Sequence, residues 1–462
     1  MKFGGTSVAD ATALENVARI VAAQRHDWPV VIVSAMSGVT DALLASTRIA
    51  SEHGADEAIG SLAETFRRHE RAAKELLPSH AGTGFSEYLS GAVTQISQLL
   101  TRANGRATQD AIVSFGELLS SRLLAETLKH RGVNAQQVDP RSCIITDDEY
   151  TCAAPLMTET SAKSRQSLLP VLEDEVVPVV GGFVGATREG ITTTLGRGGS
   201  DYTAALLGAA LRVTEIQIWT DVTGVLTADP RVVPDAQTVD RLSYSEAAEL
   251  AYFGAKVLHP KTIQPAIEDS IPVRICNSSV PQERGTLVGP QTESSPRTIK
   301  AIAHKTGVTT VQITSTRMLG AYGFLRALFE VFDRHRTVVD VVTTSEVSVS
   351  LSLDDDSTLP AVIEELEQLG TVRVEKGRAI ICVVGEGLSG TPGIAARVFS
   401  TISDINVTLI SQGASSINVT FAIEEGRVAE AVRRLHEAFF SRQNESTVNA
   451  GTAGVSPALS RK

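Results

Sequence analysis

Apolar and polar positions along the first 280 residues alternate between strand-like runs and helix-like periods. Val30–Val33 and Val176–Val180 are apolar on both faces, which is typical of strands buried in a parallel sheet. Positions 41 to 135 follow a mostly helical period. Thr192–Leu195, a helix after Ser200 and the strand Glu215–Asp221 read as a strand–helix–strand unit, which implies parallel pairing. The pattern predicts an α/β domain with a mainly parallel sheet.

Beyond residue 300 the chain repeats itself at an offset of 70 residues, as from Gly323 to Gly393 and from Val349 to Val419. Each copy has a glycine that opens an amphipathic helix, an apolar strand, a polar turn and an alternating strand. Two copies of a small α+β unit can bury their sheets together. Such pairs usually bind a ligand, and a repeat used only for dimerisation is the alternative.

These patterns divide the chain into five parts. We expect an α/β domain over 1–285, a linker over 286–300 where Ser, Pro, Gly and Thr are frequent, one repeat over 301–375, a second over 376–442, and a disordered tail over 443–462.

Composition limits the function classes. The chain has 462 residues, of which 42% are hydrophobic and 21% charged, as in soluble globular proteins of several domains. A net charge of -11 argues against nucleic-acid and anionic-membrane partners. No apolar run has membrane length and no charged stretch followed by an apolar one opens the sequence, so we expect neither a membrane span nor a secretory signal. The four cysteines are scattered without metal-ligand spacing, so we expect no protein-bound metal and a reducing cytoplasmic location.

The most informative stretch is Leu195–Asp201, in which three glycines surround Arg197 at the start of a helix. Glycines let successive N–H groups converge on an anion, and a helix start favours negative charge. The guanidinium offers a bidentate fork for carboxylate or phosphate. On this stretch alone, an anion site and an ordinary glycine-rich helix cap are equally good interpretations.

Further polar groups follow strand ends elsewhere. Lys2 stands beside Gly4 and Gly5, and since such a loop usually leaves a strand, we expect a strand before Lys2 to be absent from the sequence. Single candidate groups are Ser34 and Thr40 in the turn after a buried strand, Glu117 in a helical region, Thr220 and Asp221 at another strand end, and Arg231 and Lys256 in later loops.

Six of these motifs, in this order and spacing, resemble those of aspartate kinases: Lys2–Ser7, Gly116–Glu117, Thr194–Asp201, Trp219–Val222, Asp229–Arg231 and Phe253–Pro260. The tandem repeat resembles the paired ACT modules of these enzymes, and the likeness reaches to about residue 440. It is nearest to the single-function, lysine-sensitive type. The resemblance implies an amino acid kinase fold, a three-layer α/β/α sandwich, followed by two ferredoxin-like α+β ACT domains.

The resemblance also implies the reaction: ATP phosphorylates the β-carboxylate of aspartate to 4-phospho-L-aspartate, the first step toward lysine, threonine and methionine. Catalysis is expected from Lys2 and Asp201, with Mg²⁺ accompanying ATP. The implied aspartate site comprises Ser34, Thr40, Glu117, Arg197, Gly198, Gly199 and Ser200. The implied ATP site comprises Lys2, Phe3, Gly4, Gly5, Thr220, Asp221, Leu226, Arg231, Lys256 and Val257.

Feedback inhibition is implied through the first repeat, with lysine as the expected effector and threonine as the alternative. The effector residues would be Met318, Gly323, Phe324, Leu325, Asp340, Thr344, Ser345, Glu346 and Val347. A homodimer or tetramer through the ACT domains is expected. Three departures stand out: Leu226 replaces a frequent tyrosine near the adenine, and Ala321 and Val338 replace two serines of lysine-sensitive relatives.

Other function classes fit the sequence less well. No G-x-G-x-x-G lies between a strand and a helix, and no G-x-x-x-x-G-K-[ST] occurs, which argues against a Rossmann dehydrogenase and a Walker-type NTPase. A related kinase for glutamate or an acetylated amino acid would not need Glu117 and Arg197 as a pair. A catalytically inactive amino-acid sensor would not need Lys2 and Asp201.

Overall fold

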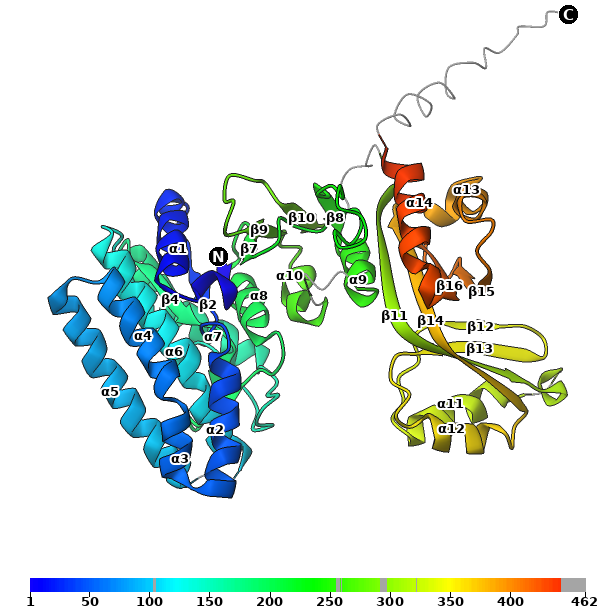
Figure 1. Cartoon of the computed structure of the whole chain (residues 1–462). Helices are drawn as coiled ribbons and strands as arrows, with labels where there is room; N and C mark the ends of the chain where they lie inside the picture. The colour runs from blue at the N-terminus through cyan, green and yellow to red at the C-terminus, as the bar shows by residue number, and fades with distance from the viewer. Residues whose placement is uncertain (103–104, 255–257, 259, 291–296, 321, 442–462) are drawn as a thin grey trace, which may run out of the picture. The chain divides into compact units, whose positions relative to one another are not determined.

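The computed structural model describes residues 1–102, 105–254, 258, 260–290, 297–320 and 322–441. The chain forms two compact units (Figure 1). The first comprises Met1–Val225, Asp240–Tyr244 and Val257–Gln291, and the second comprises Leu226–Val239, Ser245–Lys256 and Thr292–Lys462. The expected tail, 443–462, lies outside the described residues.

An eight-stranded sheet forms the centre of the first unit, in the order β3-β4-β2-β1-β7-β9-β10-β8. Its first six strands in this order run parallel, β10 is antiparallel to β9, and β8 is parallel to β10. This confirms the mainly parallel α/β fold. The strands are β1 (Lys2–Phe3), β2 (Val31–Val33), β3 (Ala135–Val138), β4 (Val177–Gly181), β7 (Ile216–Thr220), β8 (Arg241–Ser243), β9 (Val273–Asn277) and β10 (Thr286–Gly289).

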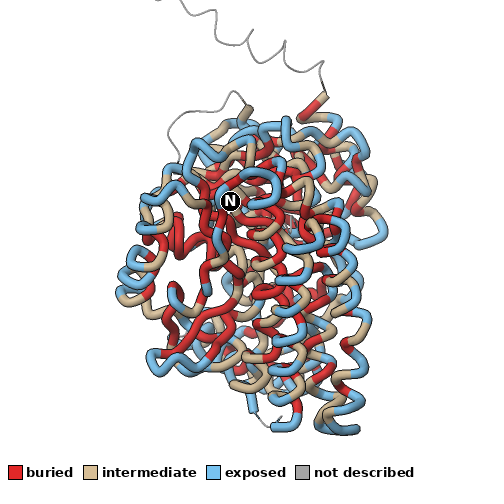
Figure 2. The backbone as a smooth tube through the Cα atoms, turned by 90° about the vertical axis from the view of Figure 1, so that its left-hand side faces the viewer, coloured by how far each residue is buried: buried red, intermediate tan, exposed pale blue. Residues whose placement is uncertain are grey.

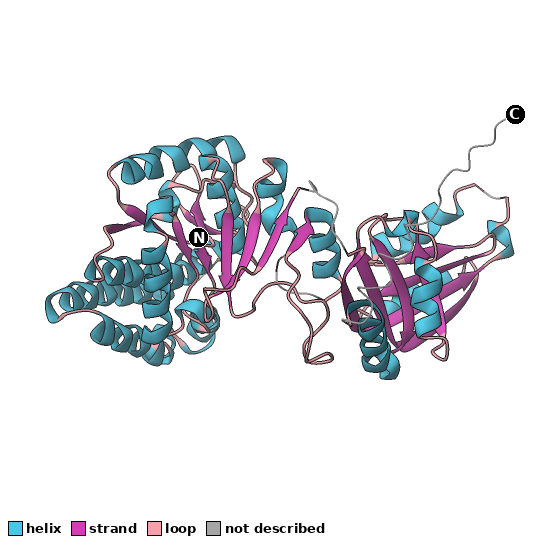
Figure 3. Cartoon of the chain, turned by 90° about the horizontal axis from the view of Figure 1, so that it is seen from above, coloured by secondary structure: helices cyan, strands magenta, loops and turns pink. Residues whose placement is uncertain are grey.

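Helices cover both faces of this sheet (Figure 3). One face carries α1 (Ala11–Ala23) and α6 (Arg106–His130), and the opposite face carries α7 (Met157–Glu173) and α8 (Gly199–Leu211). Around α6 lie α2 (Val39–His53), α3 (Ala55–Ser61), α4 (Ala63–Leu76) and α5 (Ser79–Thr101), while α10 (Gln264–Glu268) contacts α8. Buried positions of α1 and α6 share one apolar core with the strands, and α5 packs on α6. With α7 and α8 on the opposite face, this gives the three-layer sandwich.

Three sequence-based expectations need correction. The loop of Gly4 and Gly5 does leave a strand, which the sequence suggested was absent. This strand is Lys2–Phe3, which pairs on one side with β2 and on the other with β7. Thr192–Thr194 (β6) pairs with β5 (Val184–Ala186) in a separate antiparallel hairpin and is not a sheet partner of β7. The linker expected over 286–300 begins as strand β10 and ends in β11.

The second unit contains a six-stranded antiparallel sheet, in the order β12-β13-β11-β14-β16-β15. Its strands are β11 (Ile299–Thr314), β12 (Val342–Thr344), β13 (Ser348–Leu353), β14 (Thr371–Gly385), β15 (Val407–Gln412) and β16 (Asn418–Glu424). Its helices are α11 (Phe324–Arg334), α12 (Leu359–Leu366), α13 (Ile394–Thr401) and α14 (Val428–Phe440). Gly323 (φ 85°) and Gly393 (φ 80°) open equivalent helices, as the repeat predicts.

The two repeats are interleaved, because β11 and β14 are long enough to serve both. The C-terminal half of β11 and the N-terminal half of β14 complete the first βαββαβ module. The N-terminal half of β11 pairs with the C-terminal half of β14, which pairs in turn with β16. The second module therefore takes its fourth strand from residues that precede the first module in the sequence.

Segments from the middle of the chain also belong to the second unit. Ala228 and Val233 pack in the core of the second module together with α14. Thr227 is bonded to that core twice, because its carbonyl accepts from Ile302 N (2.8 Å) and its hydroxyl lies 2.9 Å from His436 Nε2 of α14. The helix α9 (Tyr244–Tyr252) continues this inserted part.

Burial follows these cores. In Figure 2 the buried backbone (red) runs through the interior, and exposed stretches (pale blue) follow outer helix faces and loops. Among the described residues, no helix is both long and apolar enough to cross a membrane.

Candidate active site

A pocket of about 360 Å³ opens in the first unit where β1, β2 and β4 end. Because parallel strands present their carboxyl ends at one edge of the sheet, residues far apart in sequence meet here. The lining includes Lys2, Gly5, Ser34, Thr40, Glu117, Arg197, Gly198, Gly199, Ser200 and Asp201. The structure thus brings together both expected catalytic residues and every residue of the expected aspartate site.

Lys2 and Asp201 form an ion pair in this pocket, with 2.7 Å between Lys2 Nζ and Asp201 Oδ1. Lys2 comes from the buried strand β1, and Asp201 lies in the first turn of α8. Gly4 N donates to Trp219 O at 3.1 Å, so the loop after β1 starts against β7. A Cβ at Gly5 would lie 3.0 Å from Ala35 O, hence a larger residue would push the two strand-end loops apart.

The start of α8 is packed tightly against the end of β4. Gly198 has φ 76°, a left-handed conformation that glycine adopts without strain. A Cβ at Gly182 would lie 2.7 Å from Ser200 Cβ, and one at Gly199 would lie 2.7 Å from the Phe183 ring. Arg197 is exposed and makes no hydrogen bond or ion pair with any residue of the described part of the chain. Its guanidinium is therefore available to an anionic ligand.

Glu117 is the buried acid of the pocket. Its residue is only 3% exposed, and its Oε2 has no hydrogen-bond partner among the described residues. Burial raises the pKa of this carboxyl to about 8. Backbone hydrogen bonding that involves Ala35 lowers the pKa, but by less than burial raises it. An uncompensated carboxylate facing a pocket favours a cationic ligand group such as an ammonium.

The expected ATP residues are less concentrated. The Phe3 side chain is fully buried and stacks on Trp219 with ring centroids 5.8 Å apart, so only its backbone is available to a ligand. Thr220 ends β7, and its hydroxyl bonds to Asp221 Oδ1 at 3.1 Å. Leu226 and Arg231 belong to the second unit. Arg231 forms an ion pair with Asp229 there, with 2.6 Å between Arg231 Nη2 and Asp229 Oδ2. Lys256 and Val257 lie outside the described residues.

The pocket also contains residues that the sequence did not single out, namely Met36, Ser37, Asp41 and Phe183. Phe183 has φ 67°, which is unfavourable for an aromatic residue. Its backbone is held on both sides, since Phe183 N donates to Thr203 Oγ1 and its carbonyl accepts from Leu195 N, both at 2.9 Å. Its position directly after a buried strand and two glycines is the signal that could have identified it.

The expected effector residues lie in the second unit. The turn after β12, which carries Ser345, Glu346 and Val347, meets the segment of Met318 through a bond from Ser315 N to Val347 O (2.8 Å). Thr344 ends β12, and Gly323, Phe324 and Leu325 lie at the start of α11. Ala321 lies outside the described residues.

Asp340, at the opposite end of β12, is already engaged. It accepts a hydrogen bond from the Tyr252 hydroxyl and lies 3.5 Å from Lys305 Nζ. Burial raises the pKa of the Asp340 carboxyl.

All four cysteines are free thiols, and three of them are buried. The described residues contain no group of three His, Cys, Asp or Glu side chains that could hold a metal.

Comparison with known proteins identifies the family. The amino acid kinase family matches residues 1–277, and an ACT domain matches residues 381–439. Aspartokinase 1, chloroplastic, of Arabidopsis thaliana is 40% identical over 95% of this chain and 80% of its own length. Lysine-sensitive aspartokinase 3 of Escherichia coli K12 is 38% identical over 95% of this chain and 98% of its own length.

Solved structures agree with the sequence relatives. The crystal structure of E. coli aspartokinase III in complex with lysine and aspartate (T-state) matches this chain with a TM-score of 0.80 at 38% identity. The match covers 95% of this chain and 99% of the E. coli chain. The crystal structure of the same enzyme in complex with aspartate and ADP (R-state) matches with a TM-score of 0.77 at 37% identity and with the same coverage. Pocket, fold and relatives agree, and the chain belongs to the aspartokinases of the amino acid kinase family.

Proposed function

We propose that the pocket transfers the γ-phosphoryl group of MgATP to the β-carboxylate of aspartate, with the residue roles given below. The observation that carries this proposal is that two groups line one pocket: the buried carboxyl of Glu117, whose Oε2 has no hydrogen-bond partner among the described residues, and the guanidinium of Arg197, which has none among them either. These two groups complement the ammonium and the α-carboxylate of an amino acid. The E. coli relative crystallised with aspartate and ADP supports the same substrates.

The chemistry needs alignment and cations more than it needs a base. A carboxylate with an ordinary pKa near ~4 is already ionised at neutral pH, so the nucleophile has no proton to lose. The obstacle is repulsion between this carboxylate and the polyphosphate. Cations placed where negative charge spreads in the transition state, together with fixed orientation, lower this barrier.

Each lining residue has a role in this scheme. Arg197 binds the α-carboxylate and Glu117 the ammonium, while Ser34, Thr40, Gly198, Gly199 and Ser200 orient the acid. Lys2 binds the β/γ-phosphate region, and Asp201, 2.7 Å away, holds the Lys2 ammonium in place. Mg²⁺ enters as part of MgATP. The other ATP contacts are assigned to the backbone of Phe3, to Gly4, Gly5, Thr220 and Asp221, and to Leu226, Arg231, Lys256 and Val257.

Steady-state kinetics with aspartate and ATP varied separately test these roles. We expect Lys2→Ala and Asp201→Ala to lower kcat, and Glu117→Gln and Arg197→Ala to raise the KM for aspartate with little change in the KM for ATP. Glutamate and acetylglutamate serve as control acceptors. Equal loss of ATP affinity in all four variants would contradict the assignment.

We further propose lysine as the feedback effector, bound by the first ACT module. The lysine-bound E. coli relative supports this choice, while Val338 in place of a serine keeps threonine as the alternative. Glu346→Ala should raise the lysine concentration for half-inhibition and leave uninhibited activity unchanged. If threonine inhibits and lysine does not, the effector assignment is wrong.

Two properties of the whole enzyme complete the proposal. Exposed apolar side chains around α11, Leu319, Tyr322, Leu325, Phe329 and Val338, support a homodimer or tetramer formed through the ACT modules. Four free thiols support a reducing compartment such as the cytoplasm. Light scattering of the purified protein, with and without lysine, tests the first property.

A further inference from the structure

Helix α6 carries a second buried acid besides Glu117. Asp110 is 1% exposed and lies seven residues before Glu117. Because seven residues make almost two full turns, both carboxylates leave the same side of the helix. Glu117 lines the pocket, whereas Asp110 is absent from its lining. Asp110 therefore needs an explanation other than direct substrate contact.

Both oxygens of Asp110 accept hydrogen bonds from segments distant in sequence. Oδ2 accepts from Thr151 N at 2.8 Å and from Thr194 N at 2.9 Å. Oδ1 accepts from the Thr194 hydroxyl at 2.7 Å. Burial raises the pKa of Asp110, and these three donors oppose that shift. The side chain thus connects α6 to the end of β6 and to the loop before α7.

These segments support the loop of Arg197. Thr194 is the last residue of β6, three positions before Arg197, and its carbonyl accepts from Ala153 N at 2.9 Å. Gly196, with φ 73°, packs so closely that a Cβ there would lie 3.3 Å from both Thr151 O and Cys152 Sγ. A shift of Thr151 or Thr194 would therefore be transmitted to Arg197.

The backbone at Thr151 shows that this connection is under strain. Its φ is 74°, which is sterically unfavourable for a β-branched residue. Such conformations persist where surrounding contacts fix them, and they occur often at functional sites. The N–H of Thr151 is the group that bonds to Asp110 Oδ2, so the carboxylate is one of the contacts that fix it.

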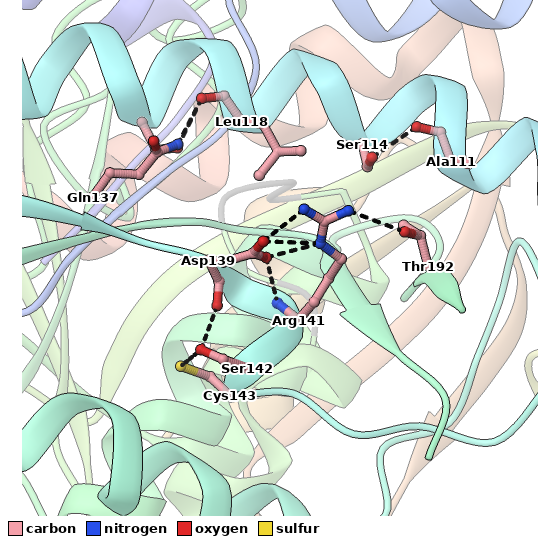
Figure 4. A network of polar contacts seen from close by, with 10 residues as sticks. Ala111, Ser114, Leu118, Gln137, Asp139, Arg141, Ser142, Cys143 and Thr192 are labelled. Atoms are coloured by element: carbon pink, nitrogen blue, oxygen red, sulfur yellow. Dashed lines mark hydrogen bonds and ion pairs between the residues drawn. The ribbon is translucent and has the colours of Figure 1, made fainter. Parts of the chain in front are cut away.

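A more exposed network braces the same helix and strand from another side (Figure 4). Gln137 Nε2 donates to Leu118 O of α6 at 2.9 Å, and Arg141, paired with Asp139, donates to Thr192 Oγ1 of β6 at 3.4 Å. Two networks therefore connect α6 to β6, and the one through Asp110 ends at Thr194, three residues before Arg197.

We propose that Asp110 is a positioning residue for aspartate: it fixes the separation between Glu117, on its own helix, and Arg197, beyond the strand end that it binds. This inference rests on the proposed function, in which those two residues hold opposite ends of the amino acid. Asp110 acts through its hydrogen bonds, and its charge is not required. Loosening it should weaken aspartate binding and leave ATP binding intact.

Two substitutions separate these possibilities. Asp110→Asn keeps the bonds, because its carbonyl can accept from both backbone amides while its NH₂ donates to the Thr194 hydroxyl. Asp110→Ala removes all three. We expect Asp110→Ala to raise the KM for aspartate about tenfold or more, with the KM for ATP within about twofold of the parent value, and Asp110→Asn to remain within about twofold for both substrates.

A milder variant and a control complete the test. Thr194→Val removes only the hydroxyl bond, and it should raise the KM for aspartate by a smaller factor even if Asp110→Ala fails to fold. Thr127→Val, which removes a buried hydroxyl bonded to Leu123 O elsewhere on α6 (2.8 Å), should leave that KM unchanged. If Asp110→Asn is impaired as much as Asp110→Ala, the charge is needed and positioning is overturned.

The remaining outcomes distinguish this inference from the proposed function. If Thr194→Val and Asp110→Ala leave the KM for aspartate unchanged while Glu117→Gln raises it, the positioning role is wrong and the proposed function stands. If Glu117→Gln and Arg197→Ala also leave it unchanged, the proposed function itself is wrong.

Discussion

We expect Glu117, in its proposed role, to make aspartate binding dependent on pH. In the empty pocket burial holds its pKa near 8, so the carboxyl is largely protonated at pH 7, yet an ammonium ligand needs the carboxylate. We expect the KM for aspartate to fall about tenfold between pH 7 and pH 9. Initial rates at saturating MgATP measure this fall. A Glu117→Gln variant should lose the dependence, and a flat profile for the parent enzyme would contradict the pKa.

The same residue should lower the stability of the fold. A carboxyl with a folded pKa near 8 and an unfolded pKa near 4.5 binds more protons in the folded state between these values, so stability falls as pH rises through that window. Glu117→Gln removes this cost. We expect the variant to match the parent near pH 4.5 and to exceed it by a few kcal/mol at pH 8, measured by urea unfolding. Equal stability at pH 8 would exclude a buried, ionisable Glu117.

At the scale of elements, the site depends on how closely the end of β4 approaches the start of α8. A Cβ at Gly182 would lie 2.7 Å from Ser200 Cβ, so Gly182→Ala must push the helix start away. We expect a loss of about 1–3 kcal/mol in unfolding free energy and a larger fractional loss in kcat/KM for aspartate. Gly91, exposed in the middle of α5 with no neighbour within 4 Å, is the matched control. Gly91→Ala should be neutral or stabilising and fully active.

The sequence predicted these elements better than it predicted their connections. Apolar runs identified β2 and β4, and the motifs located Lys2, Glu117 and Arg197, because both are properties of short stretches. The strand role of Lys2–Phe3 went unrecognised, since two residues become a strand only through partners on both sides. Asp110 stayed hidden because its partner Thr194 is 84 residues away. The sequence also did not reveal that the two ACT modules share β11 and β14, since the regular 70-residue offset suggested two consecutive modules.

At the scale of the whole molecule, the proposed effector site contacts a segment from the middle of the chain, which belongs to the second unit. Tyr252, at the end of α9, donates to Asp340, an expected effector ligand, and Lys305 lies 3.5 Å from the same carboxylate. An effector ammonium must therefore compete with these donors. We expect Tyr252→Phe to lower the lysine concentration for half-inhibition several-fold, up to about tenfold, with uninhibited kcat unchanged. A higher concentration would show that the tyrosine helps to bind the effector.

The bond between Thr227 and His436 has a consequence for synthesis on the ribosome. The two residues are 209 positions apart. In the same way, the first part of β11, Ile299–Lys305, has no pairing partner in β14 until Ile380–Gly385 has been made. At roughly 5–20 residues per second, Thr227 and its apolar neighbours stay uncovered for roughly 10–40 s after they are made. The nascent chain therefore exposes the apolar segment of Ala228 and Val233 until α14, which covers it, has been made. A ribosome that stops before α14 releases a chain in which the second module cannot complete its core, and such a chain is a substrate for chaperones and proteases.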